Sequence, residues 1–159
     1  EHNEITWIND SKGTNVGATI TAIESLGNEI SGKVILIAGG VGKDADFSGL
    51  VSPVVKHCRQ VVLFGRDKAV IEGDIRSNAE SVDDISITQV EDLMTAVAIA
   101  LENAQPQDCV LFSPACASFD QFDNYVKRGE SFVELVHQAC ASFDKKLIAQ
   151  NANQSGLVD

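Results

Sequence analysis

Three stretches of this sequence bring together cationic, hydroxyl and small side chains. They cover residues 10–15, 39–47 and 113–122. Two of them contain a lysine, Lys12 in the first and Lys43 in the second. Lysines, hydroxyls and free backbone N–H groups at a helix start attract negative charge. No paired carboxylates or positioned histidine accompany them, so the pattern predicts binding of a small anion rather than proton transfer.

The first stretch reads Asp-Ser-Lys-Gly-Thr-Asn and precedes a periodic apolar segment. One interpretation is an anion site formed by Lys12 and Thr14 at a helix N-terminus. The alternative is that Asp10, Thr14 or Asn15 simply caps the helix. Capping explains one of these residues, but it does not require a lysine near the positive end of a helix dipole.

The glycine-rich second stretch has two interpretations. Gly40, Gly42 and Ala45 fit the loose dinucleotide fingerprint, with Asp67 beyond the next expected strand. Two aspartates inside the stretch would repel a pyrophosphate, and Lys43 is not followed by Ser or Thr as in a phosphate-binding loop. We favour the alternative, a glycine turn that needs positive φ, with Lys43 in solvent.

In the third stretch, small residues would let the backbone approach a ligand, and the hydroxyl of Ser118 could donate to a carboxylate. The alternative is a cap for the following helix, with Phe119 and Phe122 in the core. Cys116 has no histidine near it in the sequence, so we do not expect covalent catalysis.

These stretches lie between alternating strand-like and helix-like segments. Apolar runs predict strands over residues 5–8, 34–38, 61–64, 85–87 and 110–112. Helical spacing of apolar residues predicts helices over 16–26, 47–58, 67–73, 90–101 and 122–136. Such alternation implies crossover connections, so we expect an α/β fold: a three-layer, Rossmann-like domain with a mostly parallel sheet. We assign residues 1–149 to this domain and 150–159 to a polar, flexible tail.

The composition of the chain argues against some classes of binding partner. The net charge of −11 would repel nucleic acid, and no apolar run is long enough to span a membrane. The four cysteines lack zinc-site spacing, which indicates free thiols in a reducing cytoplasm. We expect a cytoplasmic monomer with no metal site. Because the chain starts with Glu1 and its single methionine is Met94, we also expect it to be a piece of a longer protein.

Taken jointly, these motifs resemble the C-terminal domain of the Mur ligases, especially the D-glutamate-adding branch. The resemblance lies in residues 7–15, 39–47, 64–66, 113–122 and 127–132 and extends over nearly the whole chain. It implies an ATP- and Mg²⁺-dependent, amide-forming ligase of peptidoglycan synthesis. In that family UDP-N-acetylmuramoyl-L-alanine is activated as an acyl phosphate, and the amine of D-glutamate then attacks. The phosphate-binding loop and magnesium ligands belong to another domain, so this chain alone should be inactive.

The resemblance also implies roles for individual residues. Lys12, Thr14 and Lys43 would bind one end of D-glutamate, and Ser118 with the backbone of Phe119 would hold the side-chain carboxylate. The ring of Tyr125 would lie beside them, and Asp10 would face the ribose of ATP when the domains close. Two positions depart from the family pattern: Phe119 stands where leucine is expected, and Tyr125 where phenylalanine is expected.

Three other interpretations remain open at this point. The chain could come from a Mur ligase that adds another amino acid, or from a folylpolyglutamate ligase. It could be a stand-alone Rossmann-type nucleotide-binding module that uses the turn at Gly40 and Gly42. It could also be a non-enzymatic interaction domain, in which Lys12→Ala and Lys43→Ala would abolish no binding.

Overall fold

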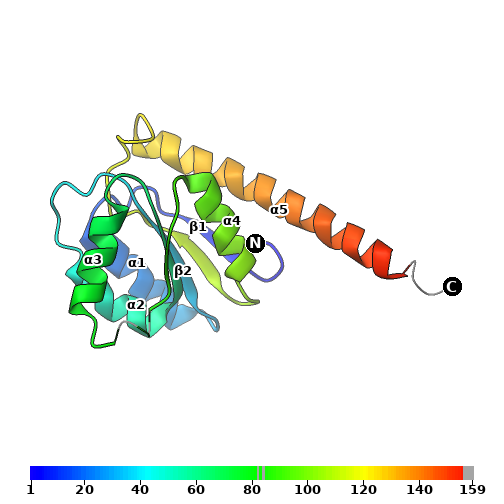
Figure 1. Ribbon diagram of the computed structural model, residues 1–159, viewed down its shortest axis with the longest axis horizontal. Helices are drawn as coiled ribbons and strands as arrows, with labels where there is room; N and C mark the ends of the chain where they lie inside the picture. Colours follow the sequence, from blue (N-terminus) through cyan, green and yellow to red (C-terminus); the bar gives the residue numbers. More distant parts are fainter. Residues whose placement is uncertain (82, 84, 156–159) are drawn as a thin grey trace.

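The structure is a computed structural model that describes residues 1–81, 83 and 85–155, without the side chains of the last two. A five-stranded sheet forms its middle layer, and all its strand pairs are parallel. Across the sheet the strands are β1 (Thr6–Asn9), β5 (Cys109–Phe112), β2 (Val34–Gly39), β3 (Cys58–Phe64) and β4 (Ile87–Gln89). The expected three-layer α/β fold is confirmed (Figure 1).

Helices cover both faces of the sheet. One face carries α1 (Val16–Glu29), the short 3₁₀ helix η1 (Ser48–Leu50), α2 (Val51–His57) and α3 (Lys68–Asn78). The other carries α4 (Leu93–Asn103) and the long α5 (Tyr125–Ser155) (Figure 1). Since both faces are covered, every residue of β2 is buried, as its uninterrupted apolar run predicts.

Two hydrophobic cores follow from this layering. Beneath α4 and α5, the rings of Phe112 and Phe132 pack with centroids 4.7 Å apart. Beneath the other helices, Phe47, Leu50 and Ile71 pack against alternate strand residues, all of them at most 1% exposed. The cores hold the strand ends in fixed positions, and the loops of interest start from those ends.

Several boundaries differ from the expected ones. β3 begins at Cys58, so the preceding helix ends at His57, and β4 covers Ile87–Gln89 rather than 85–87. α3 extends to Asn78, well beyond the expected 73, because Ile71 and Ile75 both bury against the core. Apolar periodicity alone did not separate a strand start from a helix end where both faces are buried.

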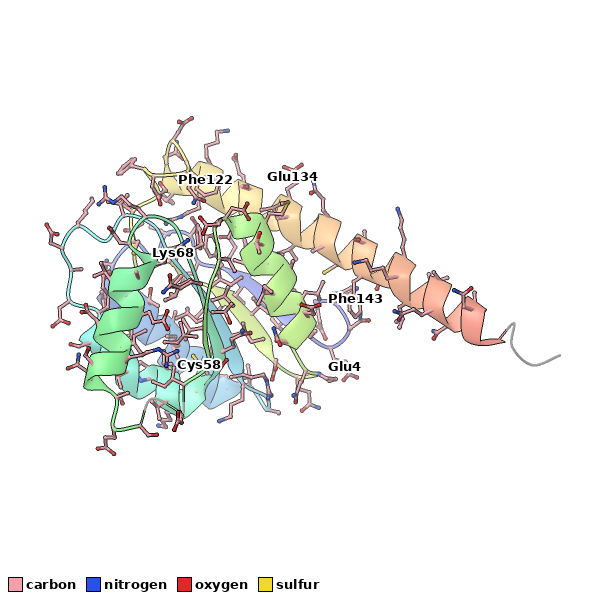
Figure 2. All side chains as sticks on the ribbon, viewed as in Figure 1. Glu4, Cys58, Lys68, Phe122, Glu134 and Phe143 are labelled. Atoms are coloured by element: carbon pink, nitrogen blue, oxygen red, sulfur yellow. The ribbon has the colours of Figure 1, made fainter. Side chains whose placement is uncertain are left out.

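The end of α5 extends beyond the rest of the domain (Figure 1). Its residues 141–153 are exposed, including Phe143, Leu147 and Ile148, and Figure 2 shows Phe143 on this extension. Residues 150–155, which we assigned to the polar tail, are helical and form the last turns of α5, while residues 156–159 lie outside the described part. Their polar composition did not rule out helix, because polar residues such as glutamine are good helix formers and can extend a helix that has already begun.

Strand order explains which loops meet. β5 lies between β1 and β2, although it comes last of the five in sequence. All three strands are parallel, so their carboxyl ends lie at the same edge of the sheet. The loops that leave those ends are residues 10–15, 113–124 and 40–47, and they are therefore neighbours. We call residues 10–15 loop 1, residues 40–47 loop 2 and residues 113–124 loop 3.

Candidate functional site

Backbone hydrogen bonds join the three loops. The N–H of Ala115 in loop 3 donates to the carbonyl of Gly13 in loop 1 over 2.9 Å. On the other side, Val41 of loop 2 and Ala117 of loop 3 exchange two hydrogen bonds of 2.9 and 3.0 Å. Loop 3 is thus the middle of one continuous surface, as expected for a parallel sheet whose strand order changes direction at this point.

Asp10 is oriented by a chain of buried hydroxyls. Ser113 Oγ donates to Asp10 Oδ2 over 2.8 Å, and Thr19 Oγ1 lies 2.9 Å from the same Ser113 oxygen. Gly13 leaves room for this arrangement, because a Cβ there would lie 2.6 Å from both Asp10 Oδ2 and Ser113 Oγ. Asp10 Oδ1 has no hydrogen bond to the described residues, so one carboxylate oxygen is available to a ligand hydroxyl.

Of the three residues of loop 1 that could cap the following helix, Asn15 is the one that does so. Its side chain accepts from the N–H of Ala18 over 2.9 Å and caps α1. Lys12 and Thr14 are not caps; both are exposed, and within the described residues their side chains make no hydrogen bond or ion pair. Lys12 borders a groove of about 730 Å³ together with Tyr125 from α5. These two side chains are therefore accessible to a ligand.

Loop 2 adopts the turn that its glycines predict. Gly39 and Gly40 have φ of +131° and +132°, and a Cβ on Gly40 would lie 2.3 Å from the carbonyl oxygen of Ala117. The N–H of Gly42 donates to Asp67 Oδ2 over 2.7 Å. Because Asp67 takes a donor that a pyrophosphate would need, this geometry disfavours the dinucleotide interpretation.

Asp67 itself is held as a carboxylate. A side-chain hydrogen bond from Arg66 and the backbone N–H of Gly42 lower the pKa of Asp67 below its usual value. The same Asp67–Arg66 pair closes the loop after β3, where the Arg66 N–H also donates to Asp120 of loop 3 over 2.8 Å. Arg66 and Asp67 therefore connect the loop after β3 to loop 3 and to loop 2, respectively.

Lys43 of loop 2 and Phe119 of loop 3 contact each other. The Lys43 ammonium lies 5.9 Å from the centroid of the Phe119 ring, and both side chains are exposed. Ser118, the preceding residue, is only 3% exposed, and its hydroxyl has no hydrogen-bond partner within the described chain. The result is a cation and a hydroxyl without polar partners, on neighbouring loops.

Tyr125 lies at the start of α5, where its side chain is 42% exposed. Its hydroxyl makes no hydrogen bond to the described residues, while its backbone carbonyl accepts from Ser11 Oγ over 2.7 Å. The structure thus places Tyr125 beside loop 1. Within the described residues, Lys12 and Thr14 make no hydrogen bond or ion pair with Lys43, Ser118 or Phe119, so a ligand would have to bridge loop 1 to loops 2 and 3.

The cysteines do not supply a nucleophile. All four thiols are free, and burial raises the pKa of Cys58 and of Cys116 to about 12 and that of Cys109 to about 11. A thiol with such a pKa stays protonated at neutral pH. Among the described residues, no cluster of three or more histidine, cysteine or acidic side chains could hold a metal ion.

Three residues were given no role in the sequence analysis but shape this surface: Ser11, Ser113 and Arg128. Arg128 is 1% exposed and donates hydrogen bonds to both loop 1 and loop 3. It lies in residues 127–132, one of the segments that carry the family resemblance, yet a single arginine on an expected helix usually lies in solvent. Two glycines of the adjoining segments, Gly13 and Gly129, were the only available signal of close packing there.

Comparison with known proteins finds related sequences over most of the chain. Residues 1–116 match the family described as "Mur ligase, glutamate ligase domain". The UDP-N-acetylmuramoylalanine–D-glutamate ligase of Hydrogenovibrio crunogenus is 54% identical over 142 residues, which are 89% of this chain and 30% of that protein. The enzyme of the same name from Pseudomonas syringae pv. syringae is 49% identical over 137 residues, 86% of this chain and 29% of that protein. The chain therefore spans about 30% of the length of these relatives.

A solved structure shares the fold. It is a domain from Haemophilus ducreyi named as a UDP-N-acetylmuramate:L-alanyl-γ-D-glutamyl-meso-diaminopimelate ligase, with a TM-score of 0.57. The match covers 89% of this chain and 93% of that domain at 13% identity, so it bears on the fold alone. No helix among the described residues is long and apolar enough to cross a membrane.

Proposed function

Because this chain belongs to the Mur ligase family, we propose that it is the amino-acid-binding domain of a ligase that joins D-glutamate to UDP-N-acetylmuramoyl-L-alanine. The complete enzyme uses ATP and Mg²⁺ in the cytoplasm, during peptidoglycan synthesis, and works as a monomer. Identity of about half over most of the chain to relatives named for this reaction supports the proposal. Since the chain is about 30% of their length, it supplies one part of the reaction and is inactive by itself.

One observation carries the proposal: two groups of unpartnered polar side chains lie at one edge of the sheet. D-glutamate has two carboxylates and needs two subsites that are cationic or donate hydrogen bonds. Lys12 and Thr14 of loop 1, with Lys43 of loop 2, hold one end of the molecule. Ser118 and the backbone N–H of Phe119 hold the side-chain carboxylate, and the ring of Tyr125 packs against the bound molecule from the side of loop 1.

Both departures from the family pattern fit this arrangement. Phe119 is 67% exposed, and its ring lies near the Lys43 ammonium, so a bulky side chain there costs no core packing. Tyr125 is 42% exposed, so its hydroxyl reaches solvent rather than lying buried without a partner. Neither substitution therefore blocks the site.

Asp10 is the residue we assign to ATP. One of its carboxylate oxygens is held by Ser113, and the other is free to accept from a ribose hydroxyl when the domains close. Loop 2 does not offer the Gly42 N–H to a phosphate, because that N–H donates to Asp67. We therefore place the phosphate and Mg²⁺ ligands in the part of the enzyme outside this chain, where ATP activates the acceptor carboxylate as an acyl phosphate.

The direct test is an NMR titration of the ¹⁵N-labelled chain with D-glutamate, with L-glutamate as the comparison. We expect weak binding, because half of the closed site is missing, with shifts confined to loops 1, 2 and 3 and larger for the D isomer. Lys12→Ala, Lys43→Ala and Ser118→Ala should each reduce those shifts. Lys145→Ala, an exposed lysine on the α5 extension, is the control and should leave them unchanged.

The alternatives predict different outcomes. A stronger response to L-glutamate would point to a folylpolyglutamate ligase or another family member. A change in NADH fluorescence on mixing would support a nucleotide-binding module. If Lys12→Ala and Lys43→Ala had no effect on any glutamate response, the assigned subsites would be wrong.

A further inference from the structure

Arg128 is a buried cation without an acidic partner. Its side chain is on the first turns of α5 and is 1% exposed, and no described aspartate or glutamate forms an ion pair with it. Burial lowers the pKa of Arg128 to about 10, which still leaves it charged at neutral pH. A desolvated charge is costly unless hydrogen bonds compensate it. Its acceptors therefore indicate what the residue does.

Those acceptors belong to two different loops. Nε donates to Ser11 Oγ over 3.0 Å and Nη2 to the Ser11 carbonyl over 2.8 Å, both in loop 1. Nη1 donates to the carbonyl of Cys116 in loop 3 over 2.9 Å. The guanidinium carbon also lies 5.8 Å from the centroid of the Phe112 ring, at the end of β5. The donors of the planar guanidinium thus join loop 1 to loop 3.

Each acceptor is close in sequence to a residue of the proposed site. Ser11 precedes Lys12, and Cys116 is two positions before Ser118. Ser11 Oγ, which accepts from Arg128, also donates to the carbonyl of Tyr125 over 2.7 Å. Arg128 therefore links the backbone beside Lys12 to the backbone near Ser118, in addition to the direct hydrogen bond from Ala115 to Gly13.

We propose that Arg128 is a positioning residue that fixes the distance between the two carboxylate subsites and so selects glutamate over the shorter aspartate. This inference rests on the proposed function for its ligand, but the link between the loops does not. A lysine would keep the charge, but its single ammonium cannot direct donors at Ser11 and Cys116 in the same planar arrangement. Arg128→Lys should therefore loosen the loops without removing the cation.

The first measurement needs no ligand: amide hydrogen exchange of the folded chain followed by NMR. In Arg128→Lys we expect exchange at least about tenfold faster at Ala115, whose N–H bonds Gly13, with no change at the strand amides of β2 and β3. Lys127→Gln is the matched control: Lys127 is one residue away, exposed and, among the described residues, its side chain pairs only with Glu130. The amide hydrogens of this control should exchange at the same rates as those of the wild type. Unchanged exchange at Ala115 in Arg128→Lys would overturn the proposal.

A second variant covers the case in which Arg128→Lys does not fold. Ser11→Ala removes the Nε acceptor and the bond to Tyr125 but leaves both carbonyl acceptors. It should speed exchange within loop 1 and leave the pair Val41 and Ala117 unaffected. Faster exchange throughout the sheet in Ser11→Ala would indicate general destabilisation and would contradict a local link.

The second measurement compares D-glutamate with D-aspartate by NMR titration. The wild type should prefer D-glutamate by about tenfold, the usual discrimination for one methylene, and Arg128→Lys should reduce that ratio to below about threefold. A ratio unchanged by Arg128→Lys, with loosened loops, would contradict the selection of length. A wild type that responds to neither compound would contradict the proposed function, and the exchange measurement would then decide the loop link alone.

Discussion

The carboxylate of Asp67 accepts the N–H of Gly42 over 2.7 Å and thereby fills the donor position that a glycine-rich turn would otherwise offer to a phosphate. The two residues are 25 positions apart and lie at the ends of neighbouring strands, β3 and β2. The turn thus resembles dinucleotide-binding turns in sequence, but a carboxylate of the same chain occupies the N–H that would bind a phosphate.

Removing that carboxylate should release the turn. In Asp67→Ala the Gly42 amide loses its acceptor and Arg66 loses its partner, so Gly42 should exchange at least about tenfold faster in NMR hydrogen exchange. Asp67→Asn keeps an acceptor oxygen and should retain most of the protection. Asp44→Asn, in the same loop, is the control. Equal exchange in Asp67→Ala and wild type would show that the bond does not stabilise the turn.

Gly40→Ala should be strongly destabilising. Its φ of +132° is unfavourable for any side chain, and the new Cβ would lie 2.3 Å from the Ala117 carbonyl oxygen. We expect the free energy of unfolding to fall by about 3 kcal/mol, measured by urea denaturation. Gly73→Ala in α3 meets no atom within 4 Å and should instead raise it by about 0.5–1 kcal/mol. Similar effects of the two substitutions would refute the close approach of loops 2 and 3.

Stability should fall in acid partly through Asp108. Burial alone would raise the pKa of Asp108, but hydrogen bonds from Arg59, Lys33 and Gln105 outweigh it and lower the pKa. A carboxyl whose pKa is lowered on folding adds stability that is present above its unfolded pKa of about 4 and lost as pH falls through the folded value. Unfolding free energy should therefore decrease below about pH 4.

Asp108→Asn tests that assignment. At neutral pH it should cost about 2–3 kcal/mol, because the amide cannot accept all the donors that face the carboxylate. Its unfolding free energy should also depend less steeply on pH below about 4. Glu24→Gln, an exposed residue of α1, should leave both quantities close to those of the wild type. An unchanged acid slope in Asp108→Asn would assign the pH dependence to other carboxyls.

The two ends of α5 should differ in their contribution to stability. Val136 is 8% exposed in the core beneath α5, whereas Ile148 is 69% exposed on the extension. Val136→Pro should cost more than about 3 kcal/mol, and Ile148→Pro less than about 1 kcal/mol, because little packs against that part of the helix. Circular dichroism should show some helix loss in both variants. A large cost for Ile148→Pro in urea denaturation would mean that the extension packs more tightly than its exposure indicates.

Much of this protein follows from its sequence alone. The period of apolar residues distinguishes strands from helices because a strand covered on both faces must be apolar throughout, as β2 is. The glycines at 39 and 40 indicate a turn because other residues are strained at positive φ. Lys12, Lys43 and Ser118 are recognisable because cations and hydroxyls before a helix favour anions. Their assignment to D-glutamate remains a prediction.

Tertiary structure decided what periodicity cannot encode. Strand order depends on packing between distant segments, and only the insertion of β5 between β1 and β2 makes the three loops neighbours. The hydrogen bonds of Asp67 to Gly42 and of Arg128 to Ser11 join residues 25 and 117 positions apart, which no local rule connects. Arg128 is the clearest case: the sequence shows a charged residue on a helix, and only the fold buries it beneath two loops that need its donors.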